Sequence, residues 1–316
     1  MVATSRRETR YVGQMKIWHG MKLTEIAKEM NKAGVLGAGR FARATEIAEE
    51  IFGKKYTCFL ALAGPMVPGG LRRIIRDLIL DGYLSAVIST GANITHDVIE
   101  ALGYRHRIGT AAARDTSLRE RGIGRIYDIN IGMSAFKRLE KWVYKTLDSL
   151  PVERRKNIAG YELLWEIGRN LKDDTSILRT AYQKKVPIIC PGIQDSMLGM
   201  NLWTYSTLRS LTINQLRDLT KLTEVAFEAD KAGAIILGGG LPKHHLMMAN
   251  MLRGGLDAAI QITMDRPEAG GLSGAPLEEA ISWGKIRNEK KIVTLIGDAT
   301  IMFPLIVATA LDAIKD

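Results

Sequence analysis

A lysine close to a tryptophan is the first place in this chain where side chains could do chemistry. Residues 281–287 read Ile-Ser-Trp-Gly-Lys-Ile-Arg, so Trp283 stands two residues before Lys285. We expect Lys285 near the end of a helix that begins around Pro276. An indole can hold a cation over its face, and burial can lower the pKa of a lysine until a neutral amine is available. The pair fits covalent amine chemistry; the alternative is a lysine whose stem covers a core tryptophan.

A glutamate before this lysine and a pair of histidines further upstream are the next candidate site residues. Glu279 stands four residues before Trp283, so on one helix the carboxylate and the indole would share a face. A surface acid is the alternative for Glu279. His244 and His245 follow a triple glycine and could begin a helix, where a capping or core role is expected for them. Adjacent helical side chains point about 100° apart and no third ligand is spaced nearby, so we predict no metal site.

The elements that must position these residues alternate along the chain. Apolar, strand-like runs are separated by segments of helical period, and the runs cover residues 57–62, 86–90, 188–190, 234–237, 258–262 and 292–296. This order predicts an α/β fold with a mostly parallel sheet and helices on both of its faces. Upstream, we expect helices over residues 23–30 and 41–52, with a break at Gly37 to Gly39. We expect a single domain over residues 1–316, with residues 1–20 as an N-terminal arm.

Small residues follow four of the predicted strands. Ala63-Gly64, Thr90-Gly91, Gly238-Gly239 and Gly297-Asp298-Ala299 each come directly after an apolar run. Open α/β sheets bind ligands beyond their carboxyl edges, and small residues let backbone N–H groups approach a phosphate. Asp298, and Asp195 in another loop of this kind, could each accept a hydrogen bond from a ribose hydroxyl or cap a helix. No G-x-G-x-x-G fingerprint follows a predicted strand, so a dinucleotide site depends on these loops together.

Composition and charge narrow the class of protein. Lysine and arginine number 44 and aspartate and glutamate 34, which gives a net charge of 44 − 34 = +10. The basic residues are scattered, and no nucleic-acid-binding motif accompanies them, so we predict no nucleic-acid partner. Cys58 and Cys190 lie in apolar runs, which indicates buried thiols in a reducing compartment. No apolar run approaches 18 residues, and we therefore expect a soluble, cytoplasmic protein with no membrane partner.

An ordered set of motifs resembles the deoxyhypusine synthase family. GGG-x-x-KHH, then SGAPLEEAISWGKIR, then a strand ending in GDAT-x-x-FPL occur in that order. The similarity continues upstream through Thr90 to Asn93 and Cys190 to Asp195, and it covers residues 20–310. The runs around Thr90 and Gly271 are similar to the archaeal and bacterial branch of the family.

The resemblance implies a Rossmann-like, NAD-dependent enzyme. It implies that the aminobutyl group of spermidine is transferred, through an imine on an enzyme lysine, to a lysine of the translation initiation factor five-A precursor. Lys285 matches the nucleophile, and His244, Glu279 and Trp283 match substrate positions. The match makes His244 a candidate catalytic residue, as a proton carrier or as a residue that orients the substrate. The positions that match contacts with NAD are Thr90, Gly91, Asp195, Gly239, Asp298 and Ala299. The family also builds its active site across a dimer interface, which implies a homo-oligomer, expected to be a tetramer. Apolar runs that look like exposed loops, such as residues 197–203, support this locally.

Departures from the eukaryotic pattern leave the amine donor open. Met200 and Leu272 stand where acidic substrate contacts would be, Met248 replaces an asparagine and Gln261 a tyrosine, and His96 stands where a glutamate contacts the cofactor side. Three interpretations follow. The first is deoxyhypusine synthase, and the second is a related transferase that makes homospermidine from small diamines such as putrescine or uses another amine such as agmatine. The third is a nucleotide-binding module without chemistry.

Overall fold

A six-stranded parallel sheet forms the centre of the molecule. The structure, a computed structural model, describes residues 11–315 apart from the side chains of residues 54, 55 and 315. The strands lie in the order β11-β10-β9-β1-β2-β7 and all neighbours are parallel. Their bounds are β1 (Thr57–Leu62), β2 (Ala86–Ser89), β7 (Ile188–Ile189), β9 (Ala232–Leu237), β10 (Ala258–Thr263) and β11 (Ile292–Ile296). These are the six predicted runs, so the expected α/β fold with a parallel sheet is confirmed.

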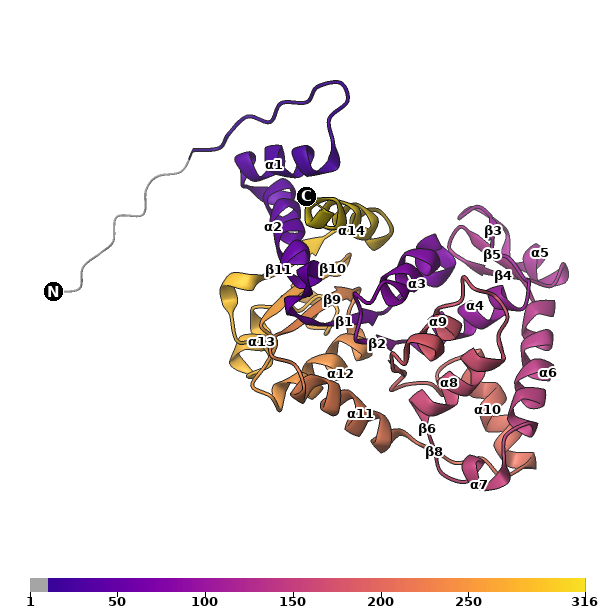
Figure 1. Cartoon of the computed structure of the whole chain (residues 1–316). Coiled ribbons are helices and arrows are strands. Elements are labelled where there is room, and N and C mark those ends of the chain that lie inside the picture. The colour runs from indigo at the N-terminus through magenta and orange to yellow at the C-terminus, as the bar shows by residue number, and fades with distance from the viewer. Residues whose placement is uncertain (1–10, 316) are drawn as a thin grey trace.

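Both faces of this sheet are buried, because side chains alternate between them along each strand. On β1, Cys58, Leu60 and Leu62 belong to one apolar core, and Phe59 and Ala61 belong to the other. Cys58 and Cys190 are free and buried, as predicted. In Figure 1, α2 and α14 cover one face with α1 packed outside them, and α11 and α12 lie on the other face.

The helices that surround the sheet differ widely in length. Their bounds are α1 (Leu23–Ala33), α2 (Leu36–Glu50), α3 (Arg72–Leu80), α4 (Gly91–Ala101), α5 (Asp115–Glu120), α6 (Ser134–Asp148), α7 (Val152–Arg155), α8 (Gly160–Asn170), α9 (Ile177–Lys184), α10 (Met197–Leu208), α11 (Gln215–Phe227), α12 (Gly240–Met251), α13 (Glu279–Ser282) and α14 (Ala299–Lys315). Short π segments cover Ile51–Lys55 and Val67–Leu71, and 3₁₀ turns cover Pro267–Ala269 and Glu289–Lys291. None of the described helices is both long and apolar enough to cross a membrane.

Two local predictions are wrong. The glycines at 37 and 39 do not break the chain before the second helix, because both lie inside the first turn and a half of α2. The break is at Gly34, and a Cβ on Gly39 would lie 2.5 Å from the carbonyl carbon of Gly34. Gly39 thus allows α1 and α2 to meet closely. The apolar run 197–203 is not a loop but the start of α10, whose Leu198 and Leu202 are buried while Trp203 is 59% exposed.

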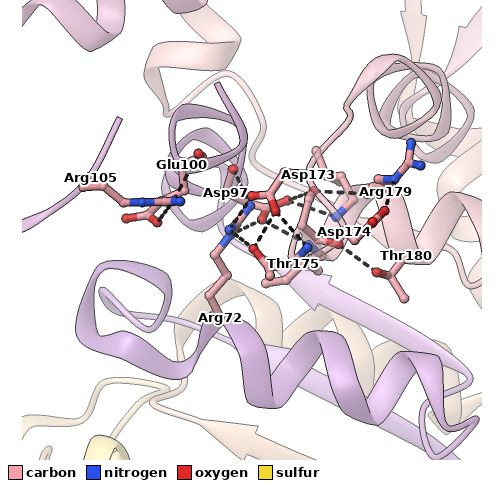
Figure 2. A network of polar contacts seen from close by, with 12 residues as sticks. Arg72, Asp97, Glu100, Arg105, Asp173, Asp174, Thr175, Arg179 and Thr180 are labelled. Carbon is pink, nitrogen blue, oxygen red and sulfur yellow. Dashed lines mark hydrogen bonds and ion pairs between the residues drawn. The ribbon is translucent and has the colours of Figure 1, made fainter. Parts of the chain in front are cut away.

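A buried ion-pair network fixes α4 against α3 and α9. Arg72 Nε donates to Asp97 Oδ1 at 2.6 Å, and Arg72 Nη1 donates to Asp173 Oδ2 at 2.9 Å (Figure 2). Asp97 also accepts from the backbone N–H groups of Ile177 and Leu178, at 3.1 and 3.0 Å, and so caps α9. Because the Asp97 side chain is fully buried and its charge is paired with that of Arg72, the network holds α4 in one position.

Two small sheets were not predicted. A three-stranded antiparallel sheet in the order β3-β5-β4 consists of β3 (Arg107–Ile108), β5 (Ile129–Gly132) and β4 (Ile123–Ile126). A two-stranded sheet pairs β6 (Ile158–Ala159) with β8 (Ile213–Asn214). The expected N-terminal arm lies partly outside the described residues; within them, residues 11–20 contain no helix or strand, and Lys16 N donates to Glu29 on α1.

Candidate active site

A cleft lies where the strand order of the main sheet reverses. From β1 the chain continues to β2 and β7 on one side, while β9, β10 and β11 lie on the other side, so β1 and β9 flank the switch point. The loops after these two strands line a cavity of about 790 Å³, together with the ends of β10 and β11. A second cavity of about 290 Å³ shares Gly64, Pro65, Pro68 and Ile126 with the first. The two form one continuous cleft at the carboxyl edge of the sheet.

The predicted strand-end loops meet in this cleft. Gly239, Asp298 and Ala299 line the larger cavity, and Thr90 and Asp195 line the smaller one. The unpredicted hairpin between β4 and β5 closes one wall with Ile126, Tyr127, Asp128 and Ile129. Five of the six residues expected to contact NAD are therefore brought together.

Gly91 is the exception, because it lines neither cavity. It is the first residue of α4 and is buried against the loop before α10. A Cβ at this position would lie 2.5 Å from Ser196 Oγ and 3.1 Å from the carbonyl oxygen of Ile193. Gly91 thus has a packing role that brings α4 and α10 together, whatever its backbone contributes to a ligand.

The helix N-termini and the aspartates that line the cleft suit a dinucleotide ligand. Three helices begin at its wall, since Thr90, Gly239 and Ala299 stand at the starts of α4, α12 and α14. Helix N-termini favour phosphate groups through their free N–H groups and dipole. Among the described lining residues there is no lysine or arginine, and Asp128 and Asp265 add carboxylates. A ligand with phosphates, hydroxyls and a cationic ring or amine would complement this wall.

The two candidate ribose acceptors differ in how they are held. Asp298 Oδ1 accepts from Thr300 N and Thr300 Oγ1, both at 2.8 Å, and so caps α14, while its Oδ2 has no partner among the described residues. Asp195 does not cap α10, because Ser196 does so by accepting from Gly199 N at 2.9 Å. The Asp195 carboxylate is exposed and forms no hydrogen bond with another described residue. Both aspartates keep a carboxylate oxygen for a ligand.

The lysine group expected to handle the amine lies beside Trp283. The ammonium of Lys285 is 5.4 Å from the centroid of the Trp283 ring, and Trp283 is 69% exposed. The expected helix from Pro276 to Lys285 is wrong: α13 covers only Glu279–Ser282, and Lys285 lies in the loop after it. The helix ends in a glycine C-cap, because Gly284 has a φ of +67° and the N–H groups of Gly284 and Lys285 donate to the carbonyls of Ile281 and Ala280, both at 3.0 Å. Leu256 N donates to the carbonyl of Lys285 at 2.9 Å, which ties this loop to the segment before β10.

His244 and Glu279 join this group from two elements. His244 lies in the first turns of α12, and burial together with the positive charge of Lys285 lowers its pKa. His244 is therefore a neutral base beside the lysine. Glu279 begins α13 and is exposed, and its charge acts on the neighbouring Lys243. None of Lys285, Trp283, His244 and Glu279 lines the cleft of the same chain.

Lys243 is a residue that sequence reasoning missed. It is only 3% exposed, and its ammonium donates to Gln261 Oε1 at 2.9 Å and to the carbonyls of Leu272 and Ala275, at 3.0 and 2.5 Å. Burial lowers the pKa of Lys243 to about 8. Gln261 in turn donates to the carbonyls of Gly238 and Ser273, both at the cleft wall. Lys243 and Gln261 together support the backbone of the cleft wall and connect it to α12, which carries His244.

The fold and the cleft define a doubly wound α/β protein, in which ligands bind at the switch point of the sheet. A sequence model described as deoxyhypusine synthase matches residues 25–310. A protein of Methanothermobacter thermautotrophicus named "Probable deoxyhypusine synthase" is 47% identical over 301 residues, 95% of this chain and 97% of the relative. A second relative, "Probable deoxyhypusine synthase 1" of Methanosarcina acetivorans, is 43% identical over 97% of this chain and 96% of the length of that relative.

The chain belongs to the deoxyhypusine synthase family and is a transferase of that kind. A crystal structure of a candidate deoxyhypusine synthase from Entamoeba histolytica has the same fold. It superimposes with a TM-score of 0.65 over 93% of this chain and 94% of its own, at 20% identity.

Proposed function

We propose that this protein transfers the aminobutyl group of spermidine to a lysine of the translation initiation factor five-A precursor, with NAD bound in the cleft. The observation that carries the proposal is the ammonium of Lys285 against Trp283, with the neutral His244 beside it, in a chain of this family. A lysine attacks a carbon only as the free amine, and His244 can take up the proton that Lys285 releases. Bound NAD would supply a hydride acceptor and later return the hydride.

The residues of the cleft suit the cofactor side of this proposal. The helix starts at Thr90, Gly239 and Ala299 would hold the pyrophosphate, and Asp298 Oδ2 and Asp195 would accept hydrogen bonds from ribose hydroxyls. Acids at the wall favour a positively charged ligand such as a polyamine. Lys243 is hydrogen-bonded to Gln261 and to two carbonyls, and it would hold the cleft wall in one conformation while substrates bind and products leave.

The Lys285 side suits the amine. Trp283 offers a ring face for an ammonium, worth about 0.5–2 kcal/mol depending on its exposure, and Glu279 adds a carboxylate near it. Lys285 would attack the oxidised carbon, displace diaminopropane and carry the four-carbon group as an imine. The acceptor lysine would then displace Lys285, and return of the hydride would reduce the new imine to the aminobutyl amine. His244 would move protons between the nitrogen atoms that leave and attack.

We also propose that the active protein is a homo-oligomer, a tetramer built from dimers, in the cytoplasm. The Lys285 group does not line the cleft of its own chain, and Trp283 is exposed. A second copy would bring the Lys285 of one chain to the cleft of the other, so that cofactor and nucleophile meet at the interface. Trp203 and Met200 on α10, 59% and 48% exposed, add apolar surface for such contacts.

A second candidate is a transferase that acts on small amines, with putrescine as the acceptor or agmatine as the donor. Met200 and Leu272 favour it, because these apolar and half-exposed side chains stand where the eukaryotic family has acids. Each lost contact between charged groups weakens binding of a tri-cation by roughly 1.5–3 kcal/mol.

The test is incubation with labelled spermidine and NAD, together with either the acceptor protein or putrescine. Label in the acceptor protein supports the first candidate, and labelled homospermidine supports the second. No transfer and no reduced NAD with spermidine, putrescine or agmatine would contradict both and favour a binding module without chemistry.

A further inference from the structure

A chain of three side chains ends at the cleft wall and has no place in the function proposed so far. His96, on α4, lines the smaller cavity together with Thr90, Asn93 and Asp195. Its Nδ1 lies 2.8 Å from Nε2 of His106, and His106 Nδ1 lies 2.7 Å from Glu100 Oε1. The order away from the cleft is therefore His96, His106, Glu100, which we call the histidine chain.

The hydrogen-bonding capacity of each atom limits where the protons can be. Burial raises the pKa of Glu100, but hydrogen bonds from His106 and Arg105 outweigh it and lower that pKa to about 2, so Glu100 is a carboxylate that can only accept. His106 Nδ1 must then donate to it. When His106 is neutral, its Nε2 is an acceptor, and His96 Nδ1 must be the donor. The remaining nitrogen, Nε2 of His96, then carries a lone pair.

His96 is kept neutral by its surroundings. Burial and the nearby His106 lower the pKa of His96 to about 4, and Phe136 packs against its ring with the centroids 6.3 Å apart. Nε2 of His96 has no hydrogen-bond partner among the described residues, and His96 lines the cavity, so this atom is available to a ligand. A neutral imidazole with a free lone pair can accept a proton from a ligand, and its lowered pKa means that it must pass a proton on rather than keep it.

The position of the histidine chain is fixed by the rest of α4. Asp97, next to His96, is held by Arg72 and caps α9 on the other side of the helix. Asn93, one turn earlier, accepts from Val67 N at 2.9 Å and donates to the carbonyl of Gly64, also at 2.9 Å. Figure 2 shows Glu100 on the same helix with Arg105 against its carboxylate, at 2.8 Å. The base therefore stands on a rigid element.

We propose that His96 is the general base of the amine oxidation, and that His106 and Glu100 are positioning residues that receive the proton. The proposal rests on the function proposed above. An amine must lose its ammonium proton before the carbon beside the nitrogen can give up a hydride. Nε2 of His96 takes that proton, and the Nδ1 proton of His96 moves to Nε2 of His106. The amine keeps its lone pair, and His106 becomes an imidazolium paired with Glu100.

Two variants with a matched control test the histidine chain. Glu100→Gln and His106→Gln interrupt the histidine chain. Arg105→Gln is the control, because Arg105 is 65% exposed and its loss removes the other side-chain partner of Glu100 but leaves the histidine chain intact. The readout is reduction of NAD by spermidine in a single turnover from pH 6 to 9. The titratable and charged groups that face His96 are His106, with Glu100 behind it, and Asp195, which lines the same cavity.

We expect the wild type and Arg105→Gln to show a rate that changes little with pH over the alkaline part of this range, above the ordinary pKa of a histidine. In the two interrupted variants the rate falls by about 10²-fold at pH 7. It then rises about tenfold per pH unit, because the substrate amine must lose its proton to solvent, as an alkyl amine does near pH 10.4. Unchanged rates, or an equal loss at every pH, would overturn the proposal. No NAD reduction by the wild type would instead overturn the proposed function.

A second measurement needs no substrate. Nitrogen NMR of the ring atoms of the unliganded protein reports the tautomer of each histidine. The histidine chain requires the proton of His96 on Nδ1 at neutral pH, and in Glu100→Gln this preference should be lost while the fold is retained. A proton on Nε2 of His96 in the wild type would contradict the proposal even if the variants are slow.

Discussion

Replacing Lys243 with methionine tests how a buried ammonium is tolerated beneath the cleft. Methionine keeps the length of the side chain and removes its charge and three hydrogen bonds, to Gln261 and to two carbonyls. At about 1.5 kcal/mol for each bond from a charged donor, their loss costs about 4–5 kcal/mol. The variant also removes the cost of burying an ammonium, which offsets part of this loss. A pKa lowered from 10.5 to about 8 corresponds to a burial cost of roughly 3 kcal/mol. We therefore expect Lys243→Met to destabilise the protein by about 1–2 kcal/mol at pH 7.

The pH dependence of the same variant is more specific. Between pH 8 and 10.5 the unfolded chain holds the lysine proton and the folded chain has released it, so the stability contributed by Lys243 rises with pH. The difference in free energy of unfolding between wild type and Lys243→Met should widen by roughly 2–3 kcal/mol from pH 7 to pH 10.

Urea unfolding at the two pH values measures this difference. Lys290→Met is the matched control, because Lys290 is exposed and its removal should leave the pH dependence unchanged. A gap between wild type and Lys243→Met that stays constant or narrows toward pH 10 would refute the assignment of Lys243 as a buried, charged support.

Three further predictions concern packing, cofactor and pH. Gly39→Ala should cost about 1–3 kcal/mol in urea unfolding because of the close approach of α1, whereas Gly37→Ala, which meets open space, should not destabilise; equal effects would contradict this. NAD at 100 times its Kd should stabilise by about 2.7 kcal/mol, and Asp298→Asn should raise that Kd in calorimetry; an unchanged Kd counts against Asp298 as a ribose contact. Between pH 4 and 6.5 His96 is protonated in the unfolded chain and neutral in the folded chain. The free energy of unfolding should therefore rise with pH by up to about 3 kcal/mol, and His96→Gln should remove most of this rise.

The main sheet could be predicted from the sequence because its strands are buried on both faces. Such strands are continuous apolar runs, and those at 57–62 and 292–296 were placed with the correct ends. The loops after them could be predicted as a ligand site for the same reason, since parallel strands bring their carboxyl ends to one edge. The hairpin that closes the cleft escaped prediction because β4 and β5 are four residues long and only half-buried.

The parts of the site that depend on contacts distant in sequence were not predictable. The helix before Lys285 was predicted too long, although Gly284, a glycine C-cap with positive φ, marks its end locally. Only the bridge between the following loop and Leu256 depends on residues distant in sequence. Lys243 was seen only as part of a motif, since its partners lie 18 to 32 residues away. His96 was identified as a departure from the family pattern, but His106 and Glu100 became its partners only when the turn after α4 was known.

The central claim is that Lys285 carries the aminobutyl group, and borohydride trapping tests it most directly. Labelled spermidine and NAD are incubated with wild type and with Lys285→Arg, borohydride is added, and the labelled peptide is identified. Arginine keeps the positive charge beside Trp283 but cannot become a neutral nucleophile. The variant should bind NAD and assemble as the wild type does. We expect label on Lys285 of the wild type and none on the variant. Equal labelling of both proteins, or undiminished transfer by the variant, would contradict the account.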